Sequence, residues 1–575
     1  MVYFYIFKPK LNPQSVVVSP PTTGQTVAPL DLTHGSSSVV VSPFAALLQG
    51  EEKYITVENA LLKVVLSTKG GAIKRVILKK YKDKHGEPLC LLDEQSSNMG
   101  LSLLHQNLLI ETKALYFETE AKSAYILKET QAAKIVFRLV LNPSQYLEHV
   151  FVFSGNGYQI NYDWHAVGME AYFNKTAQPV FCWNIDMKSL EADYKADASR
   201  STVHYYLLDQ TFDKLKESST EVEKKKIAAP IKWVGIKQRF FTSAIIADDA
   251  FAAGDLSMEP VISSDVTKSV HLSLPLSVKD QAAGHGKFIF FFGPNDYKIL
   301  KKVTKGFEQN LPLGWPVVKW VNQGVIIPLF SFLEKYISNY GLVIFLLVII
   351  IKLLLMPLSY RSFTSMAKMQ FLKPELDKIK EKYKNDLQKA QIEQVAFYRE
   401  FGINPLSGCM PILLQMPILM AMFHFFPHAI ALRQASFLWA DDLSTYDSVM
   451  RLPFTIPIYG NHVSLFTLLM VLSTILYTRS SNQSGPKDGP MKGLSYIMPF
   501  AFMFVLNTFP AGLSFYYCIS NVMTFLQQKL INYWVNVDSI KDKLMHRQQK
   551  VKQRGKLSFQ SRIASTIEAN NKKKK

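Results

Sequence analysis

The stretch that decides the fold is residues 340–358, YGLVIFLLVIIIKLLLMPL. Residues 343–351 are apolar without a break, so a helix formed there is apolar on every face. The hydrocarbon of a bilayer is about 30 Å thick and needs about 20 helical residues at 1.5 Å each. The stretch therefore predicts a membrane span, with a buried helix of a large soluble protein as the alternative.

Four more apolar stretches follow this one along the chain. They are residues 409–427, 463–478, 494–509 and 512–534. The third and fourth of the five stretches are short, which suits spans that tilt little or cross a thin bilayer. Residues 340–535 are therefore predicted to form a bundle of five spans. Just before it, 306–339 is predicted to be a linker and an amphipathic helix at residues 317–338 that lies in the membrane interface. A sixth span is the alternative, which Pro328 and Glu334 disfavour.

Residues 51–305 have a different pattern, with short runs of β-branched and aromatic residues between Gly, Pro, Asn and Asp. Long helical periodicity is scarce there, and about 250 residues of this kind predict a large β-sandwich. The expected strands include residues 54–57, 62–66, 73–78, 135–141, 150–153 and 288–292. Residues 1–50 hold a short apolar piece, 1–7, followed by a linker rich in Pro, Ser, Thr and Val.

Composition limits the function classes. The 575 residues are 48% hydrophobic and only 19% charged, below the roughly 25% usual for soluble proteins. The formal net charge of +19 suits nucleic acid, ribosomes or anionic lipid. Four cysteines are too few for a disulfide scaffold. The sequence contains none of the common hydrolase, zinc-protease or nucleotide-binding motifs, so a single-chain ATP-driven pump is not expected.

Basic residues near the spans set the expected orientation. The segment after the first span, 361–404, carries nine Lys and Arg, whereas the segment after the second has Arg433 and Arg451 against three Asp. The tail at 536–575 is strongly basic. Basic segments are thus expected in the cytoplasm and the β domain outside. Export of that domain needs an N-terminal signal or anchor, and residues 1–7 are predicted to be the remnant of a span.

Lys352 is the most informative single residue, because it lies among apolar side chains inside the first span. A cation there costs about 2.5–3.5 kcal/mol on insertion scales, and such residues usually face a wet cavity. We expect a hydrated site at Lys352, with snorkelling to the interface as the alternative. Gln415, Ser520 and Asn521 are further polar groups in spans and are expected to face the bundle interior. For the serine, bonding to its own helix backbone is equally compatible.

Two further groups of residues are candidates for contacts with substrates or partners. Met416, Met420 and Met422 lie in the second span, where flexible side chains suit varied apolar segments, although ordinary packing explains methionine as well. Segment 361–404 is predicted to be a cytoplasmic helical hairpin. Its lysines are either partner contacts or a solvated face: Lys378, Lys380, Lys382 and Lys384.

Several ordered motifs resemble one known family. They are KLLLMPL at 352–358, TSMAKM at 364–369, NPLSGC at 404–409, QMP at 415–417, LRQA at 432–435, FPAGL at 509–513, YY at 516–517 and SN at 520–521. Over nearly 200 residues they resemble the shared core of the YidC/Oxa/Alb membrane protein insertases. STKGGAI at 67–73 is similar to the periplasmic domain of the branch found in double-membrane bacteria. The resemblance covers about 51–535.

The resemblance implies a fold and a function. The fold would be a polytopic α-helical membrane bundle with five core spans plus a large periplasmic all-β supersandwich domain. The spans would enclose a hydrophilic groove, whose usual arginine is matched here by Lys352. The function would be a membrane protein insertase and folding chaperone of the bacterial inner membrane, acting with or without the Sec translocon. Its partners would be nascent membrane proteins, ribosomes and lipids, and it would need no cofactor and no metal.

Two other functions remain open. A polytopic solute transporter would place its solute at Lys352, and internal repeats would favour it, but none is evident between the spans. A membrane-anchored sugar-active enzyme would need an acid–base pair in the β domain. His149 or His165 with Glu148 or Glu170 are candidates by proximity in sequence alone.

Overall fold

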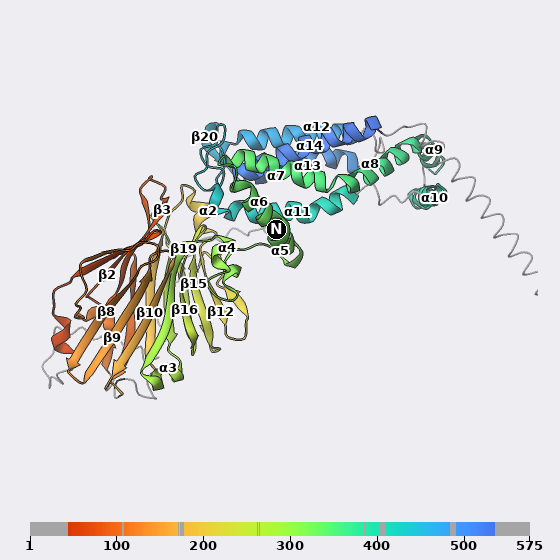
Figure 1. Ribbon diagram of the computed structural model, residues 1–575. Helices are drawn as coiled ribbons and strands as arrows, with labels where there is room; N and C mark the ends of the chain where they lie inside the picture. The colour runs from red at the N-terminus through yellow and green to blue at the C-terminus, as the bar shows by residue number, and fades with distance from the viewer. Residues whose placement is uncertain are drawn as a thin grey trace, which may run out of the picture. The chain divides into compact units, whose positions relative to one another are not determined.

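The computed structural model describes residues 44–534 except 106–107, 171, 173–177, 262, 264, 384–385, 402–409 and 483–489. The predicted N-terminal remnant at 1–7 and the basic tail at 536–575 lie outside the described residues. The described part from Leu47 onward belongs to one compact unit. Strands fill its first half and helices its second (Figure 1).

The first half contains three antiparallel or mixed sheets. The five-stranded sheet has the order β4-β3-β2-β1-β7, with β1 (Tyr54–Glu58), β2 (Leu62–Ser67), β3 (Ala72–Lys82), β4 (Pro88–Leu92) and β7 (Ala124–Ile126). The eight-stranded sheet has the order β13-β12-β15-β16-β19-β10-β9-β8, with β8 (Ala132–Asn142), β9 (Gln145–Ser154), β10 (Gln159–Val167), β12 (Thr202–Leu207), β13 (Phe212–Lys214), β15 (Ile231–Lys237), β16 (Phe241–Phe251) and β19 (His285–Pro294). The six-stranded sheet has the order β14-β17-β18-β11-β5-β6, with β5 (Ser97–His105), β6 (Leu108–Glu111), β11 (Val180–Lys188), β14 (Glu223–Ile227), β17 (Gly254–Pro260) and β18 (Val266–Pro275).

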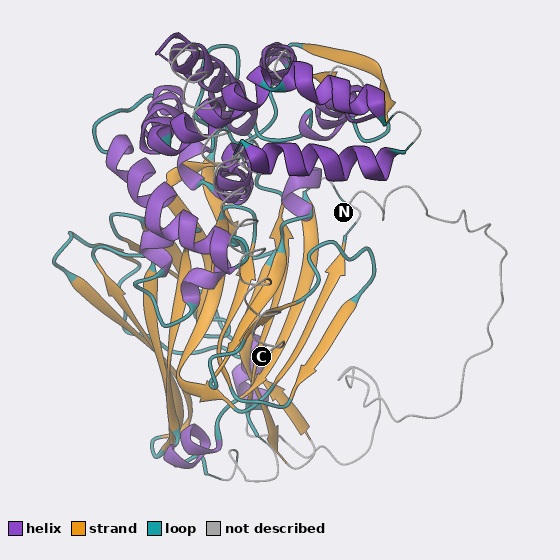
Figure 2. Cartoon of the chain, turned by 90° about the vertical axis from the view of Figure 1, so that its right-hand side faces the viewer, coloured by secondary structure: helices purple, strands orange, loops and turns teal. Residues whose placement is uncertain are grey.

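The two larger sheets pack face to face, as Figure 2 shows with the strands in orange. Side chains of β11 alternate between buried and half-buried, which is the period of a strand with one face in a core. Trp183 of β11 meets Phe290 of β19 edge to face, with ring centroids 5.9 Å apart. Aromatic pairs of this kind join the sheets into one core. All six strands named from the sequence are present.

Short helices connect and close the sheets. They are α2 (Tyr194–Ala198), α3 (Val278–Ala283), α4 (Tyr297–Leu300) and the 3-10 turns Ala45–Leu48, Thr112–Ala114 and Phe307–Asn310. The turn between β2 and β3 uses Gly70 and Gly71 at positive φ, 85° and 51°, where a side chain would be strained.

The second half is a helical bundle in which α7, α12, α13 and α14 run side by side (Figure 1). Its helices are α7 (Tyr340–Leu354), α8 (Met356–Phe371), α9 (Lys373–Lys382), α10 (Leu387–Glu400), α11 (Met410–Phe425), α12 (Leu465–Asn482), α13 (Pro490–Leu506) and α14 (Ala511–Trp534). Between α11 and α12 lie the 3-10 turns Phe426–His428 and Ile430–Leu432 and a hairpin of β20 (Met450–Ile456) and β21 (Gly460–Val463). Each of the five predicted spans overlaps one of α7, α11, α12, α13 and α14, and the first, 340–358, also includes the start of α8.

Most of the individual helices are shorter than the length needed to cross a bilayer. Within the described residues, one continuous helix, Pro316–Glu334, is long and apolar enough to cross a bilayer. Helix α7 passes the same test only together with the first part of α8, across a bend of 60°. Pro357 lies at the bend, where its missing N–H interrupts the helical bonding. The first predicted span, 340–358, therefore ends earlier as a straight helix than expected.

The helix Pro316–Glu334 comprises α5 (Pro316–Val321), a π-helical turn (Asn322–Ile326) and α6 (Ile327–Glu334). Trp315, just before this helix, and Phe330, on α6, both contact the last turn of α11. Trp315 lies 6.0 Å from His424, and Phe330 lies 5.1 Å from Phe425, between ring centroids. A helix of this length is roughly 28 Å long. Since residues 15 apart meet consecutive residues of α11, the helix lies across the end of α11 and not alongside it.

Candidate functional site

Lys352 is held between three helices of the bundle. Its side chain is only 6% exposed. The ammonium nitrogen Nζ donates to Oε1 of Gln415 on α11 at 3.2 Å and to Oγ1 of Thr524 on α14 at 2.7 Å. Both partners are neutral. The side chain therefore turns into the bundle and does not reach out to the interface.

Helix α14 supplies a polar stripe to this cluster. Nε2 of Gln415 donates to Oγ of Ser520 at 3.3 Å, and Thr524 donates to the Ser520 carbonyl at 2.7 Å. Nε2 of Gln527 donates to the Lys352 carbonyl at 3.0 Å. Ser520, Thr524 and Gln527 are spaced four and three residues apart, which places them on one helix face. Sequence reasoning missed Thr524 and Gln527, although this spacing was the available signal.

Asn521 does not join the Lys352 cluster. Its Nδ2 donates to Oγ of Ser473 at 3.2 Å and to Oγ1 of Thr474 at 2.8 Å, both on α12. Consecutive residues of a helix point about 100° apart, so Ser520 and Asn521 face different neighbours. The structure thus brings together Lys352, Gln415 and Ser520 of the predicted groove residues, while Asn521 links α14 to α12.

The Lys352 cluster is a cationic hydrogen-bond donor in an apolar bundle. An ammonium group has three N–H donors, of which these contacts use two. A buried charge that is bonded only to neutral groups keeps most of its desolvation cost. The partner that would lower its free energy most is an anionic or carbonyl oxygen from another molecule.

The three predicted slide methionines of α11 differ in exposure. Met416 is 49% exposed and Met420 is half-buried. Met422 is fully buried and packs inside the bundle. Only Met416 and Met420 can therefore meet an apolar segment outside this fold.

The predicted cytoplasmic hairpin, 361–404, contains the second part of α8 together with α9 and α10. Its apolar side chains pack with the end of α14 in one cluster, Phe363, Leu372, Leu376, Phe401 and Ile531. Lys378 is exposed beside Glu375 at 3.1 Å, and Lys382 lies 5.3 Å from the ring of Tyr383. Lys380 is half-buried, and Lys384 lies outside the described residues. Lys378 and Lys382 are thus on the solvated side of a packed helical pair.

The proposed sugar-processing pair in the β domain does not form. His149 is buried beside Phe117, and its Nδ1–H donates to the Gly71 carbonyl at 3.0 Å. Burial lowers the pKa of His149 to about 4. Glu148 is on the opposite face of β9, where it pairs with Arg138. His165 stacks on His285, and Glu170 is exposed. These residues form no shared acid–base site.

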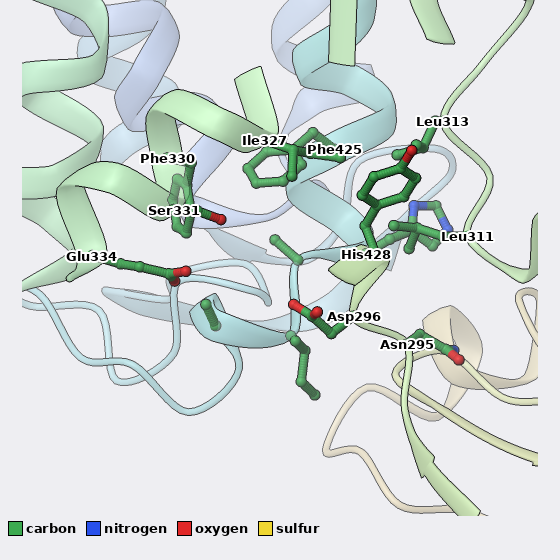
Figure 3. A pocket seen from close by; sticks show the side chains of 14 residues that line it. Asn295, Asp296, Leu311, Leu313, Ile327, Phe330, Ser331, Glu334, Phe425 and His428 are labelled. Carbon is green, nitrogen blue, oxygen red and sulfur yellow. The ribbon is translucent and has the colours of Figure 1, made fainter. Parts of the chain in front are cut away.

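A small cleft lies where the β domain, α6 and the end of α11 meet (Figure 3). Asp296, Tyr297, Glu334 and His428 are its titratable residues. Asp296 already caps α4 by accepting from two backbone N–H groups at 2.9 and 3.0 Å. The Nδ1–H of His428 donates to the His424 carbonyl at 2.9 Å, and burial holds its pKa well below the usual range. These contacts are structural. Among the described residues, no group of three or more His, Cys, Asp or Glu could hold a metal ion.

Comparison with known proteins places both halves in one family. The family model described as "60Kd inner membrane protein" matches residues 332–539, and "YidC periplasmic domain" matches residues 54–327. The membrane protein insertase YidC of Amoebophilus asiaticus is 48% identical over 99% of this chain and 96% of its own length. That of Cytophaga hutchinsonii is 38% identical over 93% and 89%.

Among solved structures, the chain is similar to one titled "Active YidC insertase crystal structure with the first transmembrane domain resolved". The match has 18% identity, covers 85% of this chain and 94% of that one, and has a TM-score of 0.34. The family matches confirm the predicted fold class, a helical membrane bundle with a large periplasmic β domain. The chain therefore belongs to the YidC family of membrane protein insertases.

Proposed function

We propose that the Lys352 cluster receives the polar tail of a nascent membrane protein while its hydrophobic segment enters the inner membrane. The observation that carries this proposal is the ammonium group of Lys352, buried in the bundle with only neutral partners. Moving a polar tail through hydrocarbon costs several kcal/mol if its groups stay unpaired. Hydrogen bonds from Lys352, Gln415 and Thr524 would lower that barrier, and no covalent step is needed.

The apolar part of the substrate would move along the bundle surface. Met416 and Met420 of α11, which are not fully buried, would make this contact. Flexible thioether side chains adapt to segments of different shape. The same surface suits a chaperone role, in which a segment rests against the bundle before it leaves into lipid. Segments could arrive directly from a ribosome or by way of the Sec translocon.

The proposed orientation has the β domain in the periplasm and the C-terminus in the cytoplasm. The basic segment 361–404 and the basic tail support the cytoplasmic placement. The helix Pro316–Glu334 would lie in the outer interface and not cross the membrane. The contacts of Trp315 and Phe330 with the same turn of α11 support this, because a crossing helix would separate these contacts by most of the bilayer.

The test is reconstitution of the purified chain in liposomes with a single-span substrate that carries an acidic tail. Protease-protected insertion is expected, and it should fall several-fold with Lys352→Ala and further with Lys352→Glu. Lys352→Arg should retain most activity, because the proposal needs the positive charge. A substrate with a neutral tail is the matched control and should be less affected. Equal insertion of both substrates by Lys352→Ala and the parent chain would refute the role of Lys352. Solute flux without insertion would favour a transporter.

A further inference from the structure

Two exposed turns between α11 and α12 carry bulky apolar residues in a strained backbone conformation. Leu438 has φ 54° and is 69% exposed, and Ile458 has φ 72° and is 58% exposed. Left-handed φ values suit Gly or Asn and are unfavourable for β-branched residues. A water-exposed turn would gain from a polar residue or glycine at both positions. The presence of Leu and Ile at these positions therefore indicates that the surroundings of both turns are apolar.

The sequence around Ile458 has the same character. Residues 449–460 are VMRLPFTIPIYG, with no carboxylate and with Arg451 as the single charge. Met450 and Phe454 of β20 are exposed as well, Phe454 to 60%. Exposed hairpin turns are usually polar, and an isolated two-stranded hairpin is marginally stable in water. Pro453 and Pro457 also remove two backbone donors that would otherwise need partners.

The hairpin is fixed to the ends of the bundle helices. Nδ2 of Asn507, just after α13, donates to the carbonyls of Tyr459 and His462 at 2.9 and 2.8 Å. Nε2 of His462 donates to the Asn507 carbonyl at 2.8 Å. Tyr459 also contacts Phe504 of α13, with ring centroids 5.5 Å apart. The exposed tip is thus held beside the end of α13, at the opposite end of the bundle from α9 and α10 (Figure 1).

The apolar surface continues from the hairpin onto α13. This helix exposes a series of large apolar side chains, Ile497, Met498, Phe500, Phe502, Phe504 and Val505. In a membrane protein such a helix surface faces acyl chains. The turn at Leu438 is fixed in a similar way, because Trp439 donates to Asp447 at 2.9 Å and packs 4.4 Å from Phe466 of α12.

We infer that the turns at Leu438 and Ile458 contact lipid of the outer leaflet and anchor the extracytoplasmic ends of α12 and α13 at the membrane interface. The occupant is lipid and not a protein partner, because the surface exposed at the hairpin is continuous with the apolar face of α13. Arg451 is the exposed cation that can meet a lipid phosphate. This inference rests on the proposed orientation, in which this end of the bundle lies at the outer face of the membrane.

The experiment uses the full chain with its four cysteines, Cys90, Cys182, Cys409 and Cys518, replaced by Ser. An environment-sensitive fluorophore is attached at Phe454→Cys, and the protein is reconstituted in vesicles of phosphatidylethanolamine and phosphatidylglycerol. We expect blue-shifted emission and strong quenching by lipids with a nitroxide near the top of the acyl chain. Asn461→Cys, exposed on the same hairpin, is the matched control and should be quenched mainly by aqueous iodide.

Two results would overturn the inference. If iodide quenches the label at 454 as strongly as at 461, the tip is in water. If neither iodide nor the lipid nitroxide reaches 454, a protein covers the tip. An impermeant thiol reagent on spheroplasts tests the orientation separately, since it should label Asn461→Cys from outside. Failure of that labelling would refute the proposed orientation, whereas lost lipid quenching with correct labelling would refute only the lipid contact.

A second variant tests whether the strain at Ile458 serves the contact. Ile458→Gly removes both the side chain and the penalty of its positive φ. We expect a midpoint of thermal unfolding in detergent that is higher by a few degrees, together with weaker nitroxide quenching at 454. Ile458→Val keeps an apolar β-branched side chain and should leave the quenching unchanged. Unchanged quenching in the glycine variant would show that Ile458 does not hold the tip in lipid.

Discussion

Arg433 and Glu191 form a buried ion pair although 242 residues separate them in the chain, with Nε of Arg433 2.8 and 3.0 Å from the two carboxylate oxygens. Glu191 lies between β11 and α2 of the β domain, and Arg433 follows α11. The guanidinium of Arg433 also lies 5.2 Å from the ring of Phe241. A second arginine, Arg239, donates to the Pro427 carbonyl at 3.3 Å. The β domain is thus joined to the loop after α11 by buried charged groups.

Breaking this pair from one side should destabilise the protein strongly. Glu191→Ala leaves Arg433 buried and unpaired, and such losses cost about 3–5 kcal/mol. Thermal unfolding of the purified chain in detergent measures the effect. The double variant Glu191→Leu/Arg433→Met should lose much less, since no charge is left unpaired. Asp249→Ala, which removes a surface partner of Lys279, is the control and should cause no measurable change. A Glu191→Ala variant as stable as the parent would contradict the importance of the pair.

Removing the β domain should leave insertion of a simple substrate largely intact, because substrates are proposed to enter from the cytoplasm. The deletion spans residues 60–300, keeps the helix Pro316–Glu334 and is fused to an added N-terminal membrane anchor. It also removes Glu191, so the remaining bundle should be stabilised by adding Arg433→Gln. In-cell complementation measures the outcome. Complete loss of insertion by a folded deletion variant would contradict the prediction.

Stability of the β domain should fall as the pH decreases from about 6.5 to 4. Burial lowers the pKa of His149 to about 4, and that of His204 to about 4. A histidine with a lowered pKa favours folding while it is neutral, so its contribution is present above pH 6.5 and is lost toward pH 4. Each lowered pKa is worth at most about 3 kcal/mol. The tryptophan fluorescence of the full chain, followed through unfolding at each pH, measures this.

Histidine variants test whether His149 and His204 cause that pH dependence of stability. His149→Phe keeps a ring beside Phe117 and should reduce the slope, because one of the two buried histidines no longer titrates. His85→Gln changes an exposed residue and should leave the slope as it is. If His149→Phe leaves the dependence of stability on pH unchanged, residues other than His149 cause it.

The partners of Lys352 should contribute to the same site. Thr524→Val removes the oxygen at 2.7 Å from Nζ while it conserves shape, and Gln415→Leu removes the other acceptor. Hydrogen bonds to charged groups contribute about 1.5–3 kcal/mol, so both variants should be less stable and should insert acidic-tailed substrates less well. Thr524→Ser keeps the hydroxyl and serves as control. In a Lys352→Met background the loss from Thr524→Val should largely disappear. Additive losses would show that the two residues act independently.

The basic tail should bind ribosomes through charge. Residues 541–575 hold twelve Lys and Arg against two acidic residues. Electrostatic binding to RNA phosphates weakens by decades between about 50 and 200 mM salt. Co-sedimentation with ribosomes, with and without residues 541–575, measures the contribution. Equal binding by the truncated chain would shift the role to Lys378 and its neighbours on α9, whereas binding to anionic vesicles alone would indicate a lipid contact.

The sequence by itself determined the division into a β half and a helical half, because both depend on local patterns. Short runs of β-branched and aromatic residues between turn residues predicted strands such as β8 and β9, and the unbroken apolar run predicted α7. Lys352 was also evident from the sequence, because a single cation in an apolar helix can be recognised before its partners are known. These features depend on whether each segment is exposed to water or to hydrocarbon. That preference is encoded by residues close together in the sequence.

The tertiary structure alone decided which distant residues meet. Helix packing placed Thr524 beside Lys352 and turned Asn521 toward α12. Contacts with one turn of α11 laid the helix Pro316–Glu334 across the bundle, although its length and composition also fit a span. The pairing of Arg433 with Glu191 has no local pattern at all. Periodicity reports the surroundings of a residue, while its partners depend on the rotation and register of helices and sheets that come together only when the whole chain is packed.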